Sequence, residues 1–116
     1  MMFEVPDNAW LTTFMGNPPD EAQPHEGFWA YSVADSSGVV LRLSYHIFEK
    51  RVSVALERNE LELVDFTHED AVRMWTEEEQ GRKVIACEFG DPDTVAKLEI
   101  ELAPRIRIRM VSLKVE

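Results

Sequence analysis

Cysteine is almost absent from this chain: Cys87 is the single one among 116 residues. No disulfide can form within the chain, which fits a reducing compartment. Cys87 lies in the mainly apolar run 84–89, which is typical of the interior of a strand. A cysteine in such a place usually behaves as a small hydrophobic residue, so we do not expect it to be a nucleophile.

Long apolar runs are also lacking. No run approaches the ~20 residues that a membrane-spanning helix needs. Residues 1–6 hold neither a basic segment nor an apolar core, so they predict no secretory signal. We therefore expect a cytoplasmic protein that does not bind or enter membranes.

Motifs for catalysis or cofactor binding are lacking as well. The five glycines never form a phosphate-binding loop, and no serine lies in a nucleophile elbow. His25, His46 and His68 show no helical i, i+4 spacing, and there is no second cysteine for a zinc site. A tertiary pairing of His46 with Cys87 stays open, although spacing gives no support for it. We expect no enzyme activity, no cofactor and no metal.

Basic residues are scarce relative to acidic ones. The chain has 12 Lys and Arg against 22 Asp and Glu, a net charge of −10. Residues 97–116 hold five basic and three acidic side chains, so residues 1–96 carry −12. Such a surface repels nucleic acid and anionic membranes and attracts basic partners. We therefore expect no nucleic-acid partner.

The first part of the chain predicts a short helix and a loop. Asp7 can cap a helix that begins near Asn8, and Gly16 suits its C-terminal end. The apolar side chains of this helix share one face and are Trp10, Leu11, Phe14 and Met15. Residues 17–27 hold three prolines and three acids without an apolar period, which predicts a loop.

Most of the remaining chain alternates apolar and polar residues. Short polar breaks separate the alternating runs, which are 29–34, 39–47, 52–57, 61–64, 82–89, 97–102 and 105–115. Alternation with a period of two predicts an antiparallel meander with one face in water.

Residues 67–80 break this pattern and predict a second helix. Thr67-His68-Glu69-Asp70 resembles a capping box, and Gly81 can end the helix. Its apolar side is formed by Ala71, Val72, Met74 and Trp75. The predicted fold is therefore α+β: one domain over residues 1–116, with an antiparallel sheet of six or seven strands, a short N-terminal helix and an inserted helix.

The last two predicted strands carry rows of charge. Arg105, Arg107 and Arg109 could form a phosphate-binding stripe. If Glu101 faces Arg105 and Glu99 faces Arg107, cross-strand ion pairs account for two of the three arginines. Arg109 would then lie opposite Lys97. The adjacent apolar residues Met110 and Val111 predict a bulge near Met110.

Acidic residues form two candidate partner-binding groups. Three acids at the end of a helix are unfavourable next to its negative C-terminus, which suggests either that the helix ends earlier or that an outside partner compensates them. The first group is Asp65, Glu69, Asp70, Glu77, Glu78 and Glu79, and the second, in the 17–27 loop, is Asp20, Glu21 and Glu26. The alternative is a solvated surface that aids solubility.

The order of the predicted elements resembles that of a known class of small proteins. It comprises the helix at 10–14, the strand that begins Gly27-Phe28-Trp29-Ala30-Tyr31, the hairpin of 41–47 and 52–56, and the terminal hairpin 98–113 around Pro104. This layout resembles the small immunity proteins of bacterial toxin–immunity systems. The resemblance implies a short, acidic, cytosolic α+β inhibitor without catalytic residues, whose partner is a cognate toxin. It transfers no binding residues to particular positions.

Three functions follow from these observations. The first is an immunity-type inhibitor that neutralises a cognate toxin, such as a nuclease, or binds another basic protein, by presenting carboxylates to its basic cleft. The second is a general interaction or oligomerisation domain, with monomer and homodimer both open. The third is a small-ligand-binding protein or enzyme that uses a cavity between sheet and helix, with Tyr45 or His46 as polar contacts.

Overall fold

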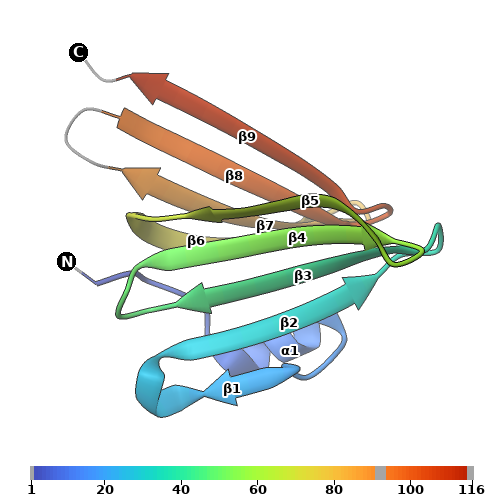
Figure 1. Cartoon of the computed structure of the whole chain (residues 1–116), viewed down its shortest axis with the longest axis horizontal. Helices are drawn as coiled ribbons and strands as arrows, with labels where there is room; N and C mark the ends of the chain where they lie inside the picture. Colours follow the sequence, from blue (N-terminus) through green and yellow to red (C-terminus); the bar gives the residue numbers. More distant parts are fainter. Residues whose placement is uncertain (1, 91–93, 115–116) are drawn as a thin grey trace.

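The computed structural model describes residues 2–90 and 94–114 and shows two antiparallel sheets (Figure 1). The first sheet has five strands, which are β1 (Glu21–Gln23), β2 (Phe28–Ala34), β3 (Val39–His46), β4 (Arg51–Arg58) and β5 (Leu61–His68). The second has four, which are β6 (Ala71–Glu79), β7 (Arg82–Gly90), β8 (Thr94–Ala103) and β9 (Arg107–Lys114). In both sheets the spatial order follows the chain.

The predicted α+β class with antiparallel strands is confirmed, but one sheet of six or seven strands is wrong. The chain passes from the first sheet to the second through Glu69 and Asp70. Asp70 has a φ of 62°, and this left-handed conformation redirects the backbone. Two backbone hydrogen bonds stabilise the turn. Ala71 N–H donates to the Lys50 carbonyl, and Gly90 N–H donates to the Asp70 carbonyl.

The helix predicted for residues 67–80 is also wrong, because this segment is the end of β5 followed by β6. The pairing of β6 with β7 shifts between Ala71 and Arg73, which indicates a bulge at Val72. The bulge places Ala71 and Met74 on the same buried side. Their spacing of three therefore imitates a helix although the backbone is extended.

The N-terminal helix α1 (Asn8–Met15) confirms the prediction. The Asp7 carboxylate accepts a hydrogen bond from Ala9 N–H at 2.9 Å, and Gly16 ends the helix with a φ of 81°. Leu11, Phe14 and Met15 are buried, whereas Trp10 is 49% exposed. The following residues are more regular than predicted: β1 pairs with β2, and Pro24–Glu26 form one 3-10 turn, η1.

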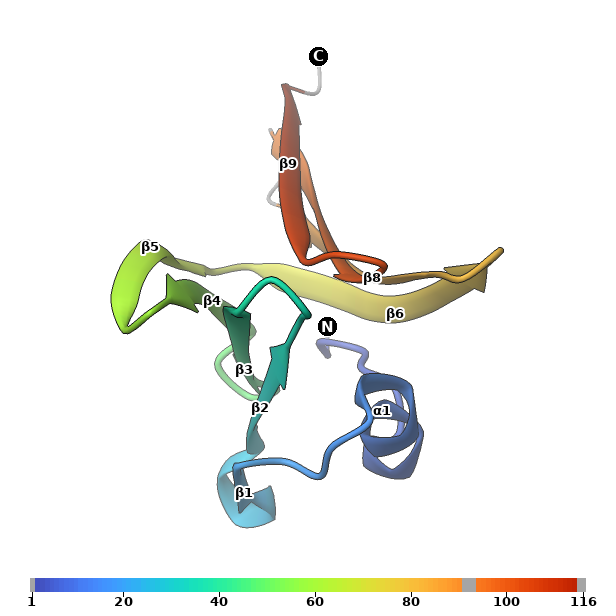
Figure 2. The ribbon, with the colours of Figure 1, turned by 90° about the vertical axis from the view of Figure 1, so that its right-hand side faces the viewer.

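The core lies between the two sheets, and α1 packs at one side of it (Figure 2). The helix forms side-chain hydrogen bonds with both sheets. The hydroxyls of Tyr31 and Tyr45 in the first sheet donate to Asn8 Oδ1 at 3.2 and 2.8 Å. Trp10 Nε1 donates to Thr76 Oγ1 in the second sheet at 2.8 Å. No helix in the described part of the chain is both long and apolar enough to cross a membrane.

The C-terminal hairpin has a register different from the predicted one. Glu101 lies opposite Arg107, Glu99 opposite Arg109 and Lys97 opposite Val111. The register is continuous over β8 and β9, so the bulge predicted near Met110 is wrong. The register differs because Arg105 belongs to the connection between the strands, where it cannot face Glu101.

Candidate partner-binding surfaces

A hollow of about 300 Å³ lies on the outer face of the first sheet. Strand residues alternate between the faces of a sheet, so the side chains beside the buried Leu43 and Val54 point outward. On this face the central strands carry short side chains, and those that line the hollow are Ala30, Ser44, Ser53 and Ala55. Short side chains here and longer ones at the edges make the sheet surface concave.

Carboxylates from both predicted groups line this hollow. Asp20 and Glu21 lie at the β1 side, and Asp65 lies on β5 at the opposite edge of the sheet. The register places Glu21 beside Ala30 and Asp65 beside Ala55. All three acids are exposed. The fold therefore brings together acids that the sequence assigned to separate groups.

Arg42, the basic residue that lines the hollow, already forms an ion pair within the sheet. Arg42 Nε donates to a carboxylate oxygen of Glu57 from the next strand. This pair leaves the charge of Asp20, Glu21 and Asp65 uncompensated at the hollow itself. The combination of separated acids and short side chains between them suits a basic side chain that enters from outside.

The other predicted acids lie elsewhere. Glu26 ends the η1 turn and is exposed. Glu69 and Asp70 form the connection between the two sheets, and Glu77–Glu79 form the end of β6. These three acids end a strand and not a helix, so the position at the end of their own helix that the sequence predicted is wrong.

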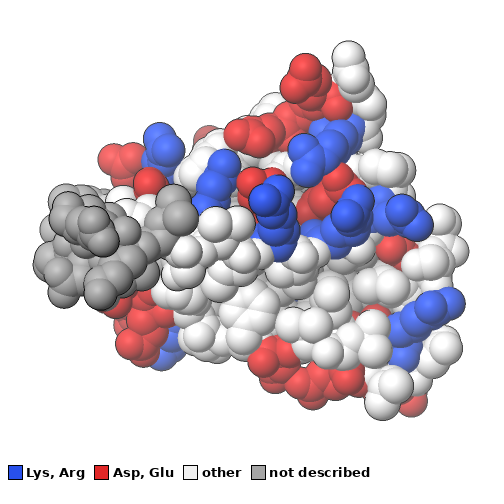
Figure 3. All heavy atoms as spheres, turned by 90° about the horizontal axis from the view of Figure 1, so that it is seen from above, with Lys and Arg blue, Asp and Glu red and all other residues white. Residues whose placement is uncertain are grey.

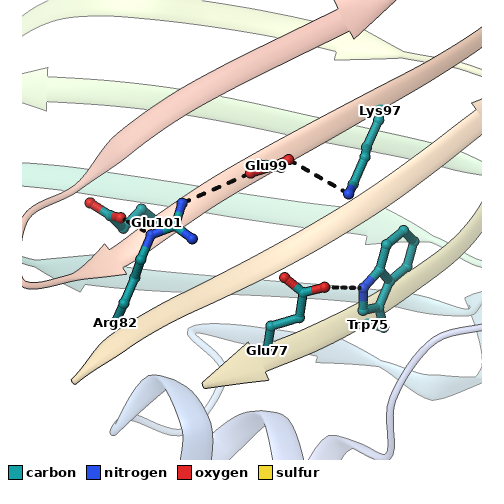
Figure 4. Close-up of polar contacts among 6 residues, drawn as sticks. All are labelled: Trp75, Glu77, Arg82, Lys97, Glu99 and Glu101. Carbon is teal, nitrogen blue, oxygen red and sulfur yellow. Dashed lines mark hydrogen bonds and ion pairs between the residues drawn. The ribbon is translucent and has the colours of Figure 1, made fainter. Parts of the chain in front are cut away.

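The surface around Glu77–Glu79 is mixed and not purely acidic. Glu78 lies opposite Lys83 and Glu79 opposite Arg82 in the β6–β7 hairpin. Glu77 accepts a hydrogen bond from Trp75 Nε1 at 3.1 Å (Figure 4). Figure 3 shows basic and acidic side chains interspersed over one half of the surface seen from above. We infer that this face attracts a basic partner less than the hollow does.

A charged network covers the outer face of the second sheet (Figure 4). Arg82 Nε donates to Glu101 at 2.5 Å, and a second guanidinium nitrogen lies 3.9 Å from Glu99. Glu99 also lies 3.6 Å from Lys97 Nζ. The sequence predicts that Glu99 and Glu101 pair with the arginine row, whereas in the structure Arg82 pairs with both. The strand pairing that places Glu101 next to Val84 near Arg82 is a long-range feature without a local signal.

The aromatic side chain of Trp75 lies at the edge of this network. The Arg73 guanidinium carbon lies 4.3 Å from the Trp75 ring centroid and the Lys97 ammonium lies 5.6 Å from it. These cation–π contacts fix the Trp75 ring on the surface of the sheet. The apolar pattern of residues 67–80 predicts Trp75 on a helix, and it gives no signal for these contacts with Arg73 and Lys97.

The groups considered for catalysis do not form a site. Cys87 is buried in the core, and burial raises the pKa of its thiol to about 12. The His46 ring lies against Phe28 in the first sheet, with the centroids 4.6 Å apart, whereas Cys87 lies in the second sheet. Tyr45 is buried and bonded to Asn8, so the space between sheet and helix is filled at this point. Within residues 2–90 and 94–114, no group of three His, Cys, Asp or Glu could hold a metal.

The fold defines a class of small proteins with two antiparallel sheets and one short helix packed beside them. One chain of a solved contact-dependent growth inhibition toxin–immunity protein complex from Klebsiella pneumoniae 342 has this fold, with a TM-score of 0.89. The two chains are 18% identical, and the superposition covers 97% of this chain and 100% of that chain. No protein-family model and no curated protein matches the sequence.

This likeness shows a common fold, because a fold by itself does not carry an activity. The resemblance to toxin–immunity systems that the sequence layout predicted is confirmed at the level of the fold.

Proposed function

We propose that this protein is an immunity-type inhibitor that binds and neutralises a cognate protein toxin. The observation that carries the proposal is the near-complete structural likeness to a chain from a toxin–immunity protein complex. The net charge of −10 supports it, because an excess of acid accelerates association with a basic partner and suppresses binding to nucleic acid. The single free cysteine is compatible with action in the cytoplasm.

The hollow on the first sheet is the surface that we propose for the toxin. Asp20 and Glu21 approach it from one edge of the sheet and Asp65 from the other. A lysine or arginine of the toxin inserted between them would meet carboxylates on two sides, where charge-assisted hydrogen bonds form. If the toxin is a nuclease, these carboxylates take the place of substrate phosphates in its basic cleft.

Co-expression with a candidate toxin tests this function. The probe is the toxin domain of the protein encoded immediately upstream of this gene, produced from an inducible promoter. We expect growth to be rescued by the wild-type chain and the two purified proteins to associate in calorimetry, more weakly as salt rises. Unchanged growth arrest, together with no heat of binding, contradicts the proposed function.

A charge-reversal series tests the surface. We expect the triple variant Asp20→Lys, Glu21→Lys and Asp65→Lys to lose rescue, because three attractive contacts become repulsive. The matched control is Glu77→Lys, Glu78→Lys and Glu79→Lys, which changes the net charge equally on the mixed face of the second sheet. Equal loss in both triples would indicate an effect of net charge and not of the hollow.

A further inference from the structure

The four edge strands of the two sheets are protected to different degrees. An edge strand presents unpaired backbone groups, and natural proteins cover or shorten such edges or place charges on them. β1 has only three residues. β6 is bridged by Glu4, whose N–H donates to Val72 O at 3.1 Å and whose carbonyl accepts from Met74 N–H at 2.7 Å. β9 carries Arg107 and Arg109, which makes its edge unattractive to an apolar strand.

β5 is neither short nor bridged by another segment in the described structure, and its charged side chains, Glu62 and Asp65, are both acidic. It has eight residues, it is the last strand of the first sheet, and β4 is its one neighbour in the described structure. Figure 2 shows β5 on the side of the molecule away from α1. Leu61, Leu63 and Val64 are 65%, 51% and 36% exposed. An edge strand with large apolar side chains in water is a template for a strand from another chain.

Charge indicates which kind of strand pairs there. Residues 59–70 carry five carboxylates and no lysine or arginine. Two copies of β5 paired antiparallel would bring acidic side chains together across the new interface, and like charges facing each other destabilise such a pair. A strand with lysine or arginine beside its apolar residues would instead meet Glu62 and Asp65 with opposite charge.

We propose that β5 is a docking edge for an extended strand of a basic partner protein, which becomes the sixth strand of the first sheet. This inference rests on the proposed function, in which the partner is the toxin. Backbone hydrogen bonds supply the pairing, and the exposed apolar side chains of β5 are covered by those of the incoming strand. Asp65 belongs both to β5 and to the hollow, so one toxin segment reaches both surfaces.

The local shape of β5 indicates where the pairing begins. The register with β4 shifts where Leu56 lies opposite Val64 and Glu57 opposite Glu62, which leaves Leu63 as an extra residue. A bulge interrupts the regular ladder at that point. The regular stretch 64–68 is therefore the part that accepts the backbone of the incoming strand, and the exposed Leu61 and Leu63 flank it.

Hydrogen exchange of the wild-type chain is the direct test. Two probes are used: the catalytically inactivated upstream-encoded toxin domain, and a short peptide of alternating lysine and valine. We expect amide exchange within residues 64–68 to slow at least about tenfold in both complexes, because edge amides become hydrogen-bonded. Unchanged exchange of residues 64–68 with both probes overturns the docking edge.

Substitutions on two edges give an independent measurement. The double variant Leu61→Lys and Leu63→Lys places charge on the β5 edge at exposed positions. The matched control, Met110→Lys and Val111→Lys, adds the same charge to β9 at residues that are 40% and 38% exposed. We expect the β5 variant to bind the toxin domain at least about 30-fold more weakly and the control to change affinity less than about threefold.

The outcomes separate this inference from the proposed function. Rescue of growth by Leu61→Lys and Leu63→Lys at full affinity leaves toxin neutralisation in place and rejects the β5 edge. Failure to bind the toxin domain, with peptide protection confined to residues 64–68, contradicts the proposed function and retains the edge. A wild-type homodimer in sedimentation, with protection at the same residues, shows that a second copy occupies the edge and rejects a basic partner strand.

Discussion

The Asp35 carboxylate accepts a hydrogen bond from Ile106 N–H at 3.1 Å and thereby joins the two sheets. Asp35 begins the turn between β2 and β3, and Ile106 lies in the connection between β8 and β9. The other carboxylate oxygen accepts from Ser37 N–H, the Ser37 hydroxyl and Val39 N–H at 2.9, 2.6 and 3.1 Å. One side chain therefore closes a local turn and anchors a residue 71 positions away.

We expect Asp35→Ala to destabilise the protein by about 2–4 kcal/mol, because several hydrogen bonds to one carboxylate are lost together. Urea unfolding followed by tryptophan fluorescence measures the change. The control is Asp20→Ala, which removes an exposed acid and should change the free energy of unfolding by less than about 0.5 kcal/mol. Equal stability of wild type and Asp35→Ala would show that the contact with Ile106 contributes nothing.

The same carboxylate predicts a pH dependence. Its hydrogen bonds, above all the one from the Ser37 hydroxyl, lower the pKa of Asp35 from 3.8 to about 2. A carboxyl whose pKa is lowered by folding stabilises the native state above its unfolded pKa, and this contribution is lost as the pH falls toward the folded pKa. The stability difference between wild type and Asp35→Ala should therefore be constant near neutral pH and shrink between pH 3.8 and about 2. A difference that stays constant down to the lower pH contradicts the assignment.

A tight turn connects β6 and β7 at the place where the sequence predicted the end of a helix. Gln80 and Gly81 have φ values of 52° and 80°, so both lie in the left-handed region. Asparagine tolerates this region better than glutamine, and alanine tolerates it less well than glycine. We expect Gln80→Asn to raise the melting temperature slightly and Gly81→Ala to cost about 1 kcal/mol. Space is not the cause for Gly81, since no atom lies within 4 Å of an added Cβ.

Cys87 offers a test of the core. Burial raises the pKa of its thiol to about 12, so little thiolate exists at neutral pH and no reagent reaches it in the folded state. We expect a disulfide reagent to label the native protein at least about a hundredfold more slowly than the urea-unfolded protein. Rapid labelling in native buffer would place Cys87 at an accessible surface and contradict the packing between the sheets.

The elements that the sequence predicted correctly have strong local signals. The Asp7 cap, the apolar face of Leu11 and Phe14 and the terminal Gly16 lie within ten residues, so neighbouring side chains decide α1. The elements that it missed depend on distant residues. The bulge at Val72 gave β6 a helix-like spacing, and the connection that holds Arg105 and Ile106 moved the β8–β9 register by two residues.

The sequence predicted the acidic residues of the candidate site but not their positions relative to one another. Asp20, Glu21 and Asp65 were named among the acidic candidates, yet their common hollow depends on three strands that separate β1 from β5. Glu77–Glu79 were grouped with Asp65 because both seemed to flank one helix. In the folded chain they lie on different sheets, and Lys83 and Arg82 lie opposite Glu78 and Glu79.

By itself the sequence determined the acid excess, the lack of catalytic and cofactor motifs, the short helix and the predominance of alternating strands. These properties depend on composition and on neighbours along the chain. Only the tertiary structure decided that the strands divide into two sheets, that β5 is an open edge and that acids from distant segments share one hollow. Alternation shows which side chains avoid water, but it does not show which strand lies beside which, because that choice depends on the packing of the whole core.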